Sequence, residues 1–519
     1  MSISYSKSRY HHLAWSTVAA LWLTACGGGG GDPVLSLPAP SPAPAPAPGP
    51  APAPAPAPAP ASVRITGLTQ QAGSNTAYTV AATTAGTVVI TLPPSPQVGD
   101  TFSVTGESAN AWRIAQNAGQ TVLTTGVSGN VAPGTVWTPP LTERIWHWLA
   151  ASSTGEVLVG GEAAGPLSTS SDGGATWTAG DSPAGPTWIS IDMSATGDRI
   201  VAVQYGGRMY TSTNRGVNWT PVAIPDLDTR PADPNPDLTN QPYESVTVSR
   251  DGQRIVAAVQ NGPLVVSSNA GQNWVAGTLG GTLLTDYWRS VDSSADGMTV
   301  MAASQSGDLY RSTDGGLTWT ARNVTVGAVP VLDNWYRLKM SADGNVVTVV
   351  GNSYGGSNAG TGIYMSRDAG ATWTLATALV ADYSAIAMSA NGQIIAVTVS
   401  DPNPTPPLGT PPRATGRVLR STDGGVTFTA VAMPGVETNW RAIAMSSDGN
   451  RLAAAIGLFQ TADPGQLYTS QGNRTSAGSL GSFTGGQGLT AEFTYLGKDL
   501  FGIDQFSVTN SSGGAFQIQ

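Results

Sequence analysis

The sequence predicts an all-β protein, in which a seven-bladed β-propeller is combined with a small β-domain formed by the segments on either side of it. Three observations predict this fold. A turn motif that ends in an aromatic residue recurs with a period of about 50 residues, and a second aromatic marker precedes every copy. Only 11% of the residues are charged, whereas 64 are glycine and 15 are tryptophan. This composition suits short strands and tight turns better than surface helices.

The turn motif has the form Ser-x-Asp-x-Gly-x-Thr-Trp and is found first from Ser170 to Trp177. The acidic or amide residue at its third position can accept backbone N–H groups across the turn. The glycine permits a positive φ, and the final aromatic residue can bury a large area between sheets. We therefore expect a structural role for the residues at the third position, which are Asp172, Asn214, Asn269, Asp314, Asp368 and Asp423. A decayed seventh copy lies near Ser470.

The second marker is an aromatic residue followed nine positions later by glycine. Its copies are Trp146/Gly155, Trp188/Gly197, Tyr243/Gly252, Trp288/Gly297, Trp335/Gly344, Tyr383/Gly392 and Trp440/Gly449. Apolar alternation between Asp-Gly and Gly-Gly turns indicates antiparallel hairpins. In the fourth unit it predicts strands at 289–293, 299–302 and 308–311, and a fourth strand that begins at 318. Seven four-stranded units predict a propeller.

The turn motif resembles the Asp-box (BNR) repeat of sialidases, sortilin-type receptors, xyloglucanases and photosystem II assembly factors. The resemblance extends roughly from Gly134 to Ser470, and it is specific for fold and weak for function. Within this region, the run Gly134-Thr-Val-Trp137-Thr-Pro139 matches Gly216-Val-Asn-Trp219-Thr-Pro221. We therefore expect the Trp137 segment to be the fourth strand of the seventh blade, which closes the ring without an exposed edge.

Residues 1–25 have the features of a secretory signal peptide, in which basic residues precede a short apolar stretch. That stretch is shorter than the roughly 20 apolar residues that a membrane span needs. The ending Leu23-Thr-Ala-Cys26 resembles the lipobox of bacterial lipoproteins, which implies lipidation of Cys26 and an exported protein anchored in a membrane, with Gly27 favouring the outer membrane. Residues 26–61 are rich in glycine and then in alternating Ala-Pro, which predicts a semi-rigid polyproline II stalk.

Residues 62–131 and 475–519 flank the expected propeller at 132–474. The segments 88–92 and 101–104 are expected to form a hairpin, and 491–495 and 505–508 also alternate as strands. Because closure of the ring brings its ends together, we expect the two flanks to meet. They would then form one small β-domain that the propeller interrupts. The runs 92–100 and 112–117, together with 485–495, resemble parts of small β-domains of phage-tail and bacterial surface proteins. Two independent flanks are the alternative.

Composition also limits the partners and the metal or catalytic sites that the protein can have. A formal net charge of −9 without a basic stripe disfavours a nucleic-acid partner. Cys26 is the only cysteine, which excludes a disulfide within the chain and a cysteine-rich metal site. His147 is the only histidine after the leader, so a multi-histidine metal site is excluded and a Ser-His-Asp triad would have to use it. We expect neither a metal nor a cofactor.

Loop length varies only between units and between the second and third strands of a unit, and in a propeller both kinds of loop lie on one face. Elaborated loops on a rigid framework are where binding residues concentrate. The first-strand aromatic residues at this face can be explained by packing of blade on blade, whereas their varied neighbours are harder to explain in that way. The candidates for ligand binding are Trp146, His147, Trp188, Glu244, Asp286, Trp288, Arg289, Asp333, Trp335, Arg337, Asp382, Trp440 and Arg441.

We expect a non-catalytic cell-envelope lipoprotein that binds a protein or a glycan through this face. A secreted glycoside hydrolase is the first alternative. Sialidases use an arginine triad for a carboxylate, and Arg289, Arg337 and Arg441 could supply one. However, sialidase propellers have six blades, and the Arg-Ile-Pro motif of that family is absent here.

A hydrolase of the xyloglucanase type would need two carboxylates about 5–9.5 Å apart. Asp286, Asp333 and Glu437 are available, but nothing in the sequence singles out a pair. The second alternative is an assembly factor for a membrane protein complex, and the long stalk fits that role poorly.

Overall fold

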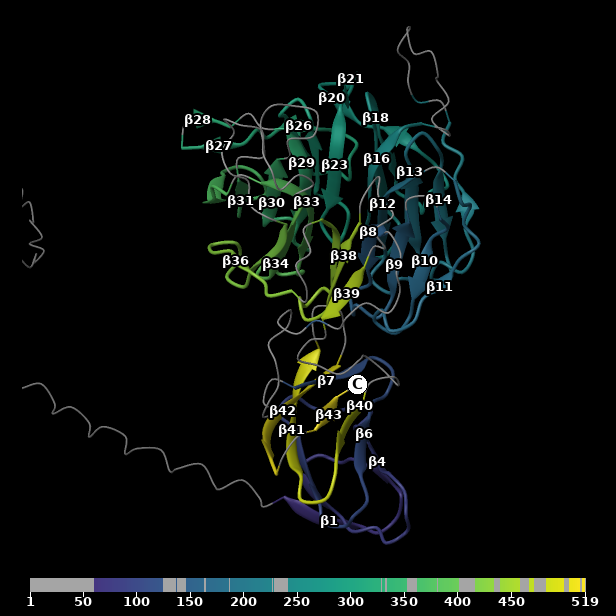
Figure 1. The fold of residues 1–519 in the computed structure, drawn as a ribbon, viewed down its shortest axis with the longest axis vertical. Helices are drawn as coiled ribbons and strands as arrows, with labels where there is room; N and C mark the ends of the chain where they lie inside the picture. Colours follow the sequence, from purple (N-terminus) through teal and green to yellow (C-terminus); the bar gives the residue numbers. More distant parts are fainter. Residues whose placement is uncertain are drawn as a thin grey trace, which may run out of the picture. The chain divides into compact units, whose positions relative to one another are not determined.

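The computed structural model describes residues 60–124, 137, 146–162, 165–185, 187–225, 227, 241–327, 329–331, 334–351, 362–379, 381–400, 416–433, 439–457, 466–470, 482–498, 504–513 and 516–518. The predicted signal peptide, Cys26 and the stalk up to residue 59 lie outside these residues. All the regular elements that are described are β-strands (Figure 1), and no helix long and apolar enough to cross a membrane occurs among them.

Seven antiparallel sheets follow one another from Trp146 to Ser470, which confirms the seven-bladed propeller. Blades 1 and 2 consist of β8 (Trp146–Ala151), β9 (Leu158–Glu162), β10 (Ser168–Ser170) and β11 (Thr178–Ala179), then β12 (Trp188–Met193), β13 (Ile200–Gln204), β14 (Met209–Ser212) and β15 (Thr220–Pro221). Blades 3 and 4 consist of β16 (Tyr243–Val248), β17 (Ile255–Val259), β18 (Gly262–Ser267) and β19 (Val275–Ala276), then β23 (Trp288–Ser293), β24 (Val300–Ser304), β25 (Leu309–Ser312) and β26 (Thr320–Ala321).

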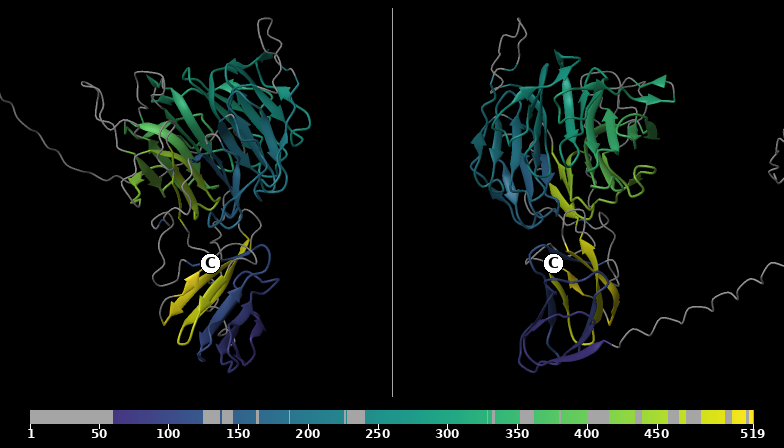
Figure 2. Two further views of the ribbon diagram at one scale, coloured as in Figure 1. Left: turned by 45° about the vertical axis from the view of Figure 1, so that its right-hand side comes forward. Right: turned by 180° about the vertical axis from the view of Figure 1, so that it is seen from behind.

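Blades 5 to 7 continue the same pattern (Figure 2). They consist of β29 (Trp335–Met340), β30 (Val347–Gly351), β31 (Ile363–Ser366) and β32 (Thr374–Thr377), then β33 (Asp382–Met388), β34 (Ile395–Ser400), β35 (Arg417–Ser421) and β36 (Thr429–Ala430), and finally β37 (Trp440–Met445), β38 (Leu452–Ile456) and β39 (Leu467–Ser470). Short strands decorate the connections, namely β20 (Thr278–Leu279), β21 (Thr282–Leu283), β22 (Thr285–Asp286), β27 (Thr325–Val326) and β28 (Val329–Pro330).

A closed circle of backbone hydrogen bonds joins the seven blades. In each blade, the residue that lies seven positions after the first-strand aromatic donates its N–H to the carbonyl oxygen of the same position in the next blade, at 2.6–2.9 Å. The members are Ser153, Ala195, Arg250, Ala295, Ala342, Ala390 and Ser447. Ser447 of blade 7 donates to Ser153 of blade 1, so the circle has seven members and closes on itself.

The turn motif joins the third and fourth strands, and its hydrogen bonds explain its composition. In blade 4, Asp314 accepts the backbone N–H and the hydroxyl of Thr318 at 2.9 and 2.6 Å, and also the hydroxyl of Ser312 at 2.7 Å. Burial alone would raise the pKa of Asp314, but these hydrogen bonds outweigh burial and lower it. The indole of Trp319 donates to the Gly316 carbonyl at 2.8 Å, and Gly316 has a φ of 96°. The motif is therefore a self-contained turn.

Trp137 occupies the place of the missing fourth-strand aromatic in blade 7. It is 6% exposed and lies in the hydrophobic cluster of Trp440 and Tyr468. The corresponding residue of blade 2, Trp219, lies in the cluster of Trp188. The other residues of the predicted closing segment lie outside the described part of the chain.

The two flanks form one small β-domain of two sheets. The N-terminal strands are β1 (Ala61–Ile65), β2 (Thr69–Gln71), β3 (Thr76–Val80), β4 (Val88–Thr91), β5 (Thr101–Gly106), β6 (Trp112–Ala115) and β7 (Gln120–Leu123). The C-terminal strands are β40 (Ser482–Gly485), β41 (Thr490–Lys498), β42 (Asp504–Ser512) and β43 (Gln517–Ile518). The sheet orders are β1-β3-β5-β41-β42-β7 and β2-β4-β6-β40-β43. Strands from both ends of the sequence therefore lie side by side, as the purple, blue and yellow arrows of Figure 2 show.

The predicted hairpin between 88–92 and 101–104 is wrong. Strand β4 pairs in parallel with β2 and β6, whereas β5 pairs in parallel with β3 and in antiparallel fashion with β41. The chain thus alternates between the two sheets and winds as a two-sheet solenoid. Strands β4 and β5 both alternate between buried and partly exposed residues. Such alternation occurs in a hairpin and in successive turns of a solenoid, so the local pattern could not distinguish the two.

Candidate functional site

The first strands of the blades enclose a central channel, in which the described residues line three adjoining cavities. We call them the mouth, the middle and the floor, with volumes of about 30, 100 and 140 Å³. Trp148 and Arg337 line both the mouth and the middle. Asp192, Asp292 and Lys339 line both the middle and the floor. The shared lining makes the three cavities consecutive parts of one channel.

A β-bulge in every first strand directs polar side chains into the mouth. The pairing with the second strand shifts immediately after the leading aromatic residue in all seven blades. A bulge redirects side chains locally. The first two positions after the aromatic therefore supply the lining of the mouth, with His147 and Trp148 from β8 and Tyr336 and Arg337 from β29.

Arg337 is the central cation of the mouth. It is 8% exposed, and its guanidinium carbon lies 3.8 Å from the ring centre of Tyr336 and 4.4 Å from that of Trp148. Its Nη1 donates to the carbonyl oxygens of Tyr336 and Arg289, at 2.8 and 3.2 Å. Its buried Nε has no hydrogen-bond partner in the described part of the chain. Burial lowers the pKa of Arg337 and outweighs the opposite effects of Tyr336 and Glu244, whereas the charges of Arg289 and Arg441 lower it further.

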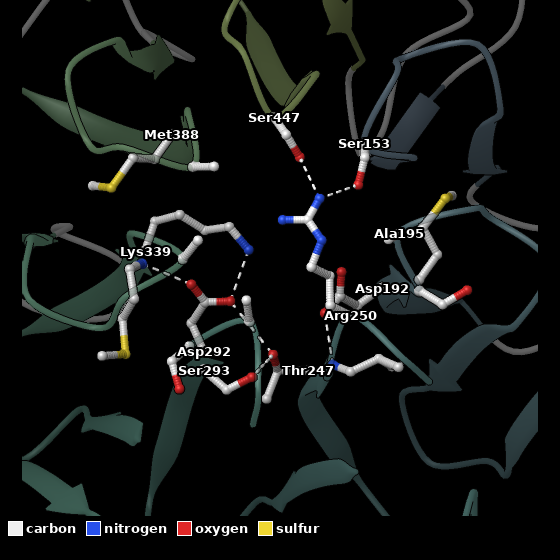
Figure 3. Close-up of a pocket in the computed structure, with 18 of the residues that line it drawn as sticks. Ser153, Asp192, Ala195, Thr247, Arg250, Asp292, Ser293, Lys339, Met388 and Ser447 are labelled. Atoms are coloured by element: carbon white, nitrogen blue, oxygen red, sulfur yellow. Dashed lines mark hydrogen bonds and ion pairs between the residues drawn. The ribbon is translucent and has the colours of Figure 1, made fainter. Parts of the chain in front are cut away.

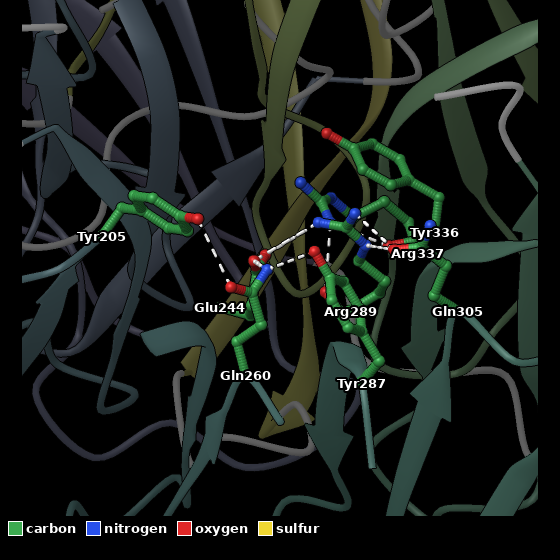
Figure 4. Close-up of polar contacts among 8 residues, drawn as sticks. All are labelled: Tyr205, Glu244, Gln260, Tyr287, Arg289, Gln305, Tyr336 and Arg337. Carbon is green, nitrogen blue, oxygen red and sulfur yellow. Dashed lines mark hydrogen bonds and ion pairs between the residues drawn. The ribbon is translucent and has the colours of Figure 1, made fainter. Parts of the chain in front are cut away.

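Glu244 and Arg289 form an ion pair beside Arg337, within a network shown in Figure 4. The Arg289 Nη1 lies 3.3 Å from the Glu244 Oε1, and the Arg289 Nε donates to Gln305 at 2.9 Å. Gln260 donates to both Glu244 and Tyr287, at 2.7 Å each. Burial raises the pKa of Glu244, and the neighbouring arginines act in the opposite direction. The network fixes Arg289 and Glu244 in place across blades 3 and 4.

His147 and Arg441 complete the mouth on the side of blades 1 and 7. Burial, with a smaller contribution from Arg441, lowers the pKa of His147 to about 4. His147 is therefore neutral at pH 7. Of the described residues that line the mouth, Arg337 and Arg441 are positively charged and none is acidic, in a chain whose formal net charge is −9. The mouth is thus suited to an anionic group.

Hydroxyl groups in the middle of the channel connect neighbouring blades. Ser190, Ser245 and Ser290 accept the backbone N–H of Val246, Val291 and Leu338, respectively, at 3.0–3.1 Å. Each bond joins a blade to the next one. These serines hold the walls of the channel in place.

The floor contains two carboxylates and two cations (Figure 3). Asp292 accepts the Lys339 ammonium and the Met340 N–H, at 2.7 Å each. Asp192 accepts the Val248 N–H, also at 2.7 Å. Arg250 reaches across the channel and donates to the Ser153 hydroxyl at 2.6 Å. Each carboxylate therefore accepts a backbone N–H from the first strand of the next blade.

The prediction that five tryptophans bind a ligand is wrong, because all five are buried. The indoles of these residues are 0–1% exposed and belong to the hydrophobic clusters between blades: Trp146, Trp188, Trp288, Trp335 and Trp440. Those of Trp188, Trp288 and Trp335 also donate to carbonyl oxygens of the preceding blade, at 2.8–3.1 Å. A side chain without exposed surface cannot contact a ligand, so these residues hold the blades together.

The predicted acidic candidates do not gather at the mouth. Asp286 accepts the Tyr287 N–H and the Ser306 hydroxyl, at 2.7 and 3.0 Å, and does not line any of the three cavities. Asp382 is 7% exposed at the start of β33 and does not line them either. Asp333 and Glu437 lie outside the described residues. Within the described ranges, no group of three or more potential ligands could hold a metal ion.

Sequence reasoning missed the charged residues deeper in the channel. Position four after the leading aromatic lines the channel in blades 2 to 5, and in four of the seven blades this position carries Ala or Thr. In the other three it carries Asp192, Asp292 and Lys339. Charged residues at one column of otherwise apolar or small residues were the signal that could have revealed them. Arg250 similarly stands among alanines and serines at position seven.

The fold and the channel define a seven-bladed β-propeller with a polar, positively charged channel mouth. No family model matches the chain, and no curated protein matches it either. Similar solved structures include YCF48 from Cyanidioschyzon merolae, with 16% identity, a TM-score of 0.44, and coverage of 64% of this chain and 98% of that one.

Two further structures show the same kind of similarity. YCF48 bound to D1 peptide has 13% identity, a TM-score of 0.43 and coverage of 65% and 96% of the two chains. The β-propeller domain of Cps50 (Swd1) from Myceliophteria thermophila has 12% identity, a TM-score of 0.45 and coverage of 64% and 99%. At such identities the likeness concerns the fold alone.

Proposed function

We propose that this chain is a non-catalytic envelope lipoprotein whose propeller binds an acidic group of a partner protein at the channel mouth. The observation that carries the binding role is Arg337. Its charge is buried beside Arg289 and Arg441, and it has no ion-pair partner of its own in the described part of the chain. Glu244, the carboxylate that acts on Arg337, is already paired with Arg289. Burial of the Arg337 charge therefore remains costly, and an incoming carboxylate would offset that cost with charge-assisted hydrogen bonds.

The size and composition of the mouth favour a protein over a glycan. The mouth itself, at about 30 Å³, has room for roughly two water molecules, which suits one carboxylate group. Tyr, Trp and Arg, which surround the mouth, are also the residues that dominate binding energy at protein interfaces. The carboxylates in the channel are held by backbone N–H groups or by arginine, which favours binding over hydrolysis.

Arrays of acidic peptides and acidic glycans, probed with the full chain, test the binding role. We expect acidic peptides to bind, and Arg337→Ala to weaken them by about tenfold or more, because a hydrogen bond to a charged group contributes about 1.5–3 kcal/mol. Arg289→Ala and Arg441→Ala should weaken binding less, and added salt should weaken it further.

Arg215→Ala is the matched control, because Arg215 is 51% exposed and pairs with Asp198 in the turns at the other end of the strands. It should leave peptide binding unchanged. Unaltered binding in all three mouth variants, or retention of glycans alone, would refute the proposal.

The envelope location rests on the leader sequence. If Cys26 carries a lipid, then Cys26→Ser should release the exported chain from the membrane fraction, which can be measured by cell fractionation. A variant that stays in the membrane fraction as the native chain does would contradict the lipid anchor.

A further inference from the structure

Asp192 is a channel carboxylate without an ion-pair partner in the described part of the chain. One of its oxygens accepts the Val248 N–H at 2.7 Å. The Lys339 ammonium pairs with Asp292 instead, at 2.7 Å. Burial raises the pKa of Asp192, Lys339 lowers it and Asp292 raises it. Two carboxylates and one ammonium leave a net negative charge at this depth of the channel.

The charge of the channel therefore changes sign along its axis. Arg337, with Arg289 and Arg441, makes the mouth positive, whereas Asp192 and Asp292 make the next level negative. Below that level, Arg250 crosses to Ser153 and Ser447 and carries a positive charge again (Figure 3). A ligand that enters from the mouth meets a cation first and a carboxylate second.

Hydrogen bonds to a single strand give the spacing between these two levels. The Arg337 guanidinium is bonded to the Tyr336 carbonyl, and the Asp292 carboxylate to the Met340 N–H, both on β29. Asp192 makes the equivalent bond to Val248 on β16. Four residues of strand span about 13 Å. A contact of about 3 Å at each end leaves roughly 7 Å between the two charged groups of a ligand.

We propose that the channel binds a ligand whose carboxylate and ammonium groups lie about 7 Å apart, with the carboxylate at Arg337 and the ammonium at Asp192. A lysine residue at the C-terminus of a protein has this chemistry, because six bonds separate its α-carboxyl carbon from its ammonium nitrogen, about 7 Å when extended. A free ω-amino acid has the same chemistry. The inference rests on the proposed function and deepens it, since it names the group that enters the mouth.

Calorimetry with the full chain tests the inference using 6-aminohexanoate and hexanoate, which differ only in the ammonium group. We expect 6-aminohexanoate to bind at least about tenfold more tightly, the gain that one charged hydrogen bond provides. Asp192→Asn should remove this preference, because an amide can still accept the Val248 N–H but carries no charge. Asp198→Asn is the control, since Asp198 lies in an exposed turn of the same blade and is 55% exposed.

Equal binding of the two probes to the native chain would overturn the inference without any variant, and so would an undiminished preference in Asp192→Asn. Acidic peptides that still bind in either case would leave the proposed function standing. If 6-aminohexanoate, hexanoate and every acidic peptide all fail to bind, both the inference and the proposed function are refuted.

A pair of peptides that end in lysine, one with a free carboxylate and one amidated, separates the two sources of the ligand. Tighter binding of the free-carboxylate peptide than of 6-aminohexanoate supports a protein C-terminus. Tighter binding of 6-aminohexanoate supports a free amino acid.

Discussion

His147 shows how a single residue connects the channel to pH. It is 5% exposed and lines the mouth, and burial lowers its pKa to about 4, with the charge of Arg441 as the second cause. An unfolded chain exposes this imidazole, whose ordinary pKa is about 6.5. Between these two values the unfolded state binds a proton that the folded state does not bind. Folded-state stability therefore falls as the pH falls from 6.5 to 4, and this contribution is constant below pH 4.

His147→Gln should remove that part of the pH dependence. Between pH 7 and pH 4 we expect the native chain to lose on the order of 3 kcal/mol more stability than the variant, the value of a shift of this size. Denaturant unfolding of both proteins at several pH values measures the difference. Parallel pH profiles would show that His147 is not held neutral in the folded protein.

For other single residues, the sequence predicted the position in the channel correctly in some cases and wrongly in others. Arg289, Arg337 and Arg441 were identified because they follow the recurrent aromatic, and the structure places Arg337 and Arg441 in the lining of the mouth and Arg289 beside Arg337. The five tryptophans at the aromatic position were misassigned as ligand contacts. A sequence pattern marks a residue as recurrent, but only three-dimensional packing shows whether its surface is available.

At the scale of elements, the repeat made the blades predictable. The strands expected in the fourth unit match β23 to β26 to within one or two residues, because each is bounded by a turn with a defined chemistry. The small domain has no repeat. There the same alternation was compatible with a hairpin or with a solenoid, and the parallel pairing of β2, β4 and β6 depends on distant partners such as β40.

At the scale of the whole molecule, closure depends on contacts between the beginning and the end of the propeller. Blade 7 has three described strands, β37, β38 and β39, and Trp137 supplies the aromatic residue that the fourth strand supplies elsewhere. The backbone bond from Ser447 to Ser153 and the reach of Arg250 to both serines secure the same junction. The end of the ring is thus joined to its start at two places: in the hydrophobic cluster around Trp137 and at the channel, where Ser447, Ser153 and Arg250 meet.

Trp137→Ala should weaken this junction selectively. Removing a buried tryptophan costs about 3–5 kcal/mol, and because propeller sheets contact mainly their neighbours, the loss should be concentrated in blade 7. We expect faster hydrogen exchange from Trp440 to Ser470. Trp219→Ala, which removes the equivalent indole of blade 2, should instead accelerate exchange from Trp188 to Pro221. Unchanged exchange in β37 to β39 after loss of Trp137 would mean that its segment does not belong to the ring, and that the blades close without it.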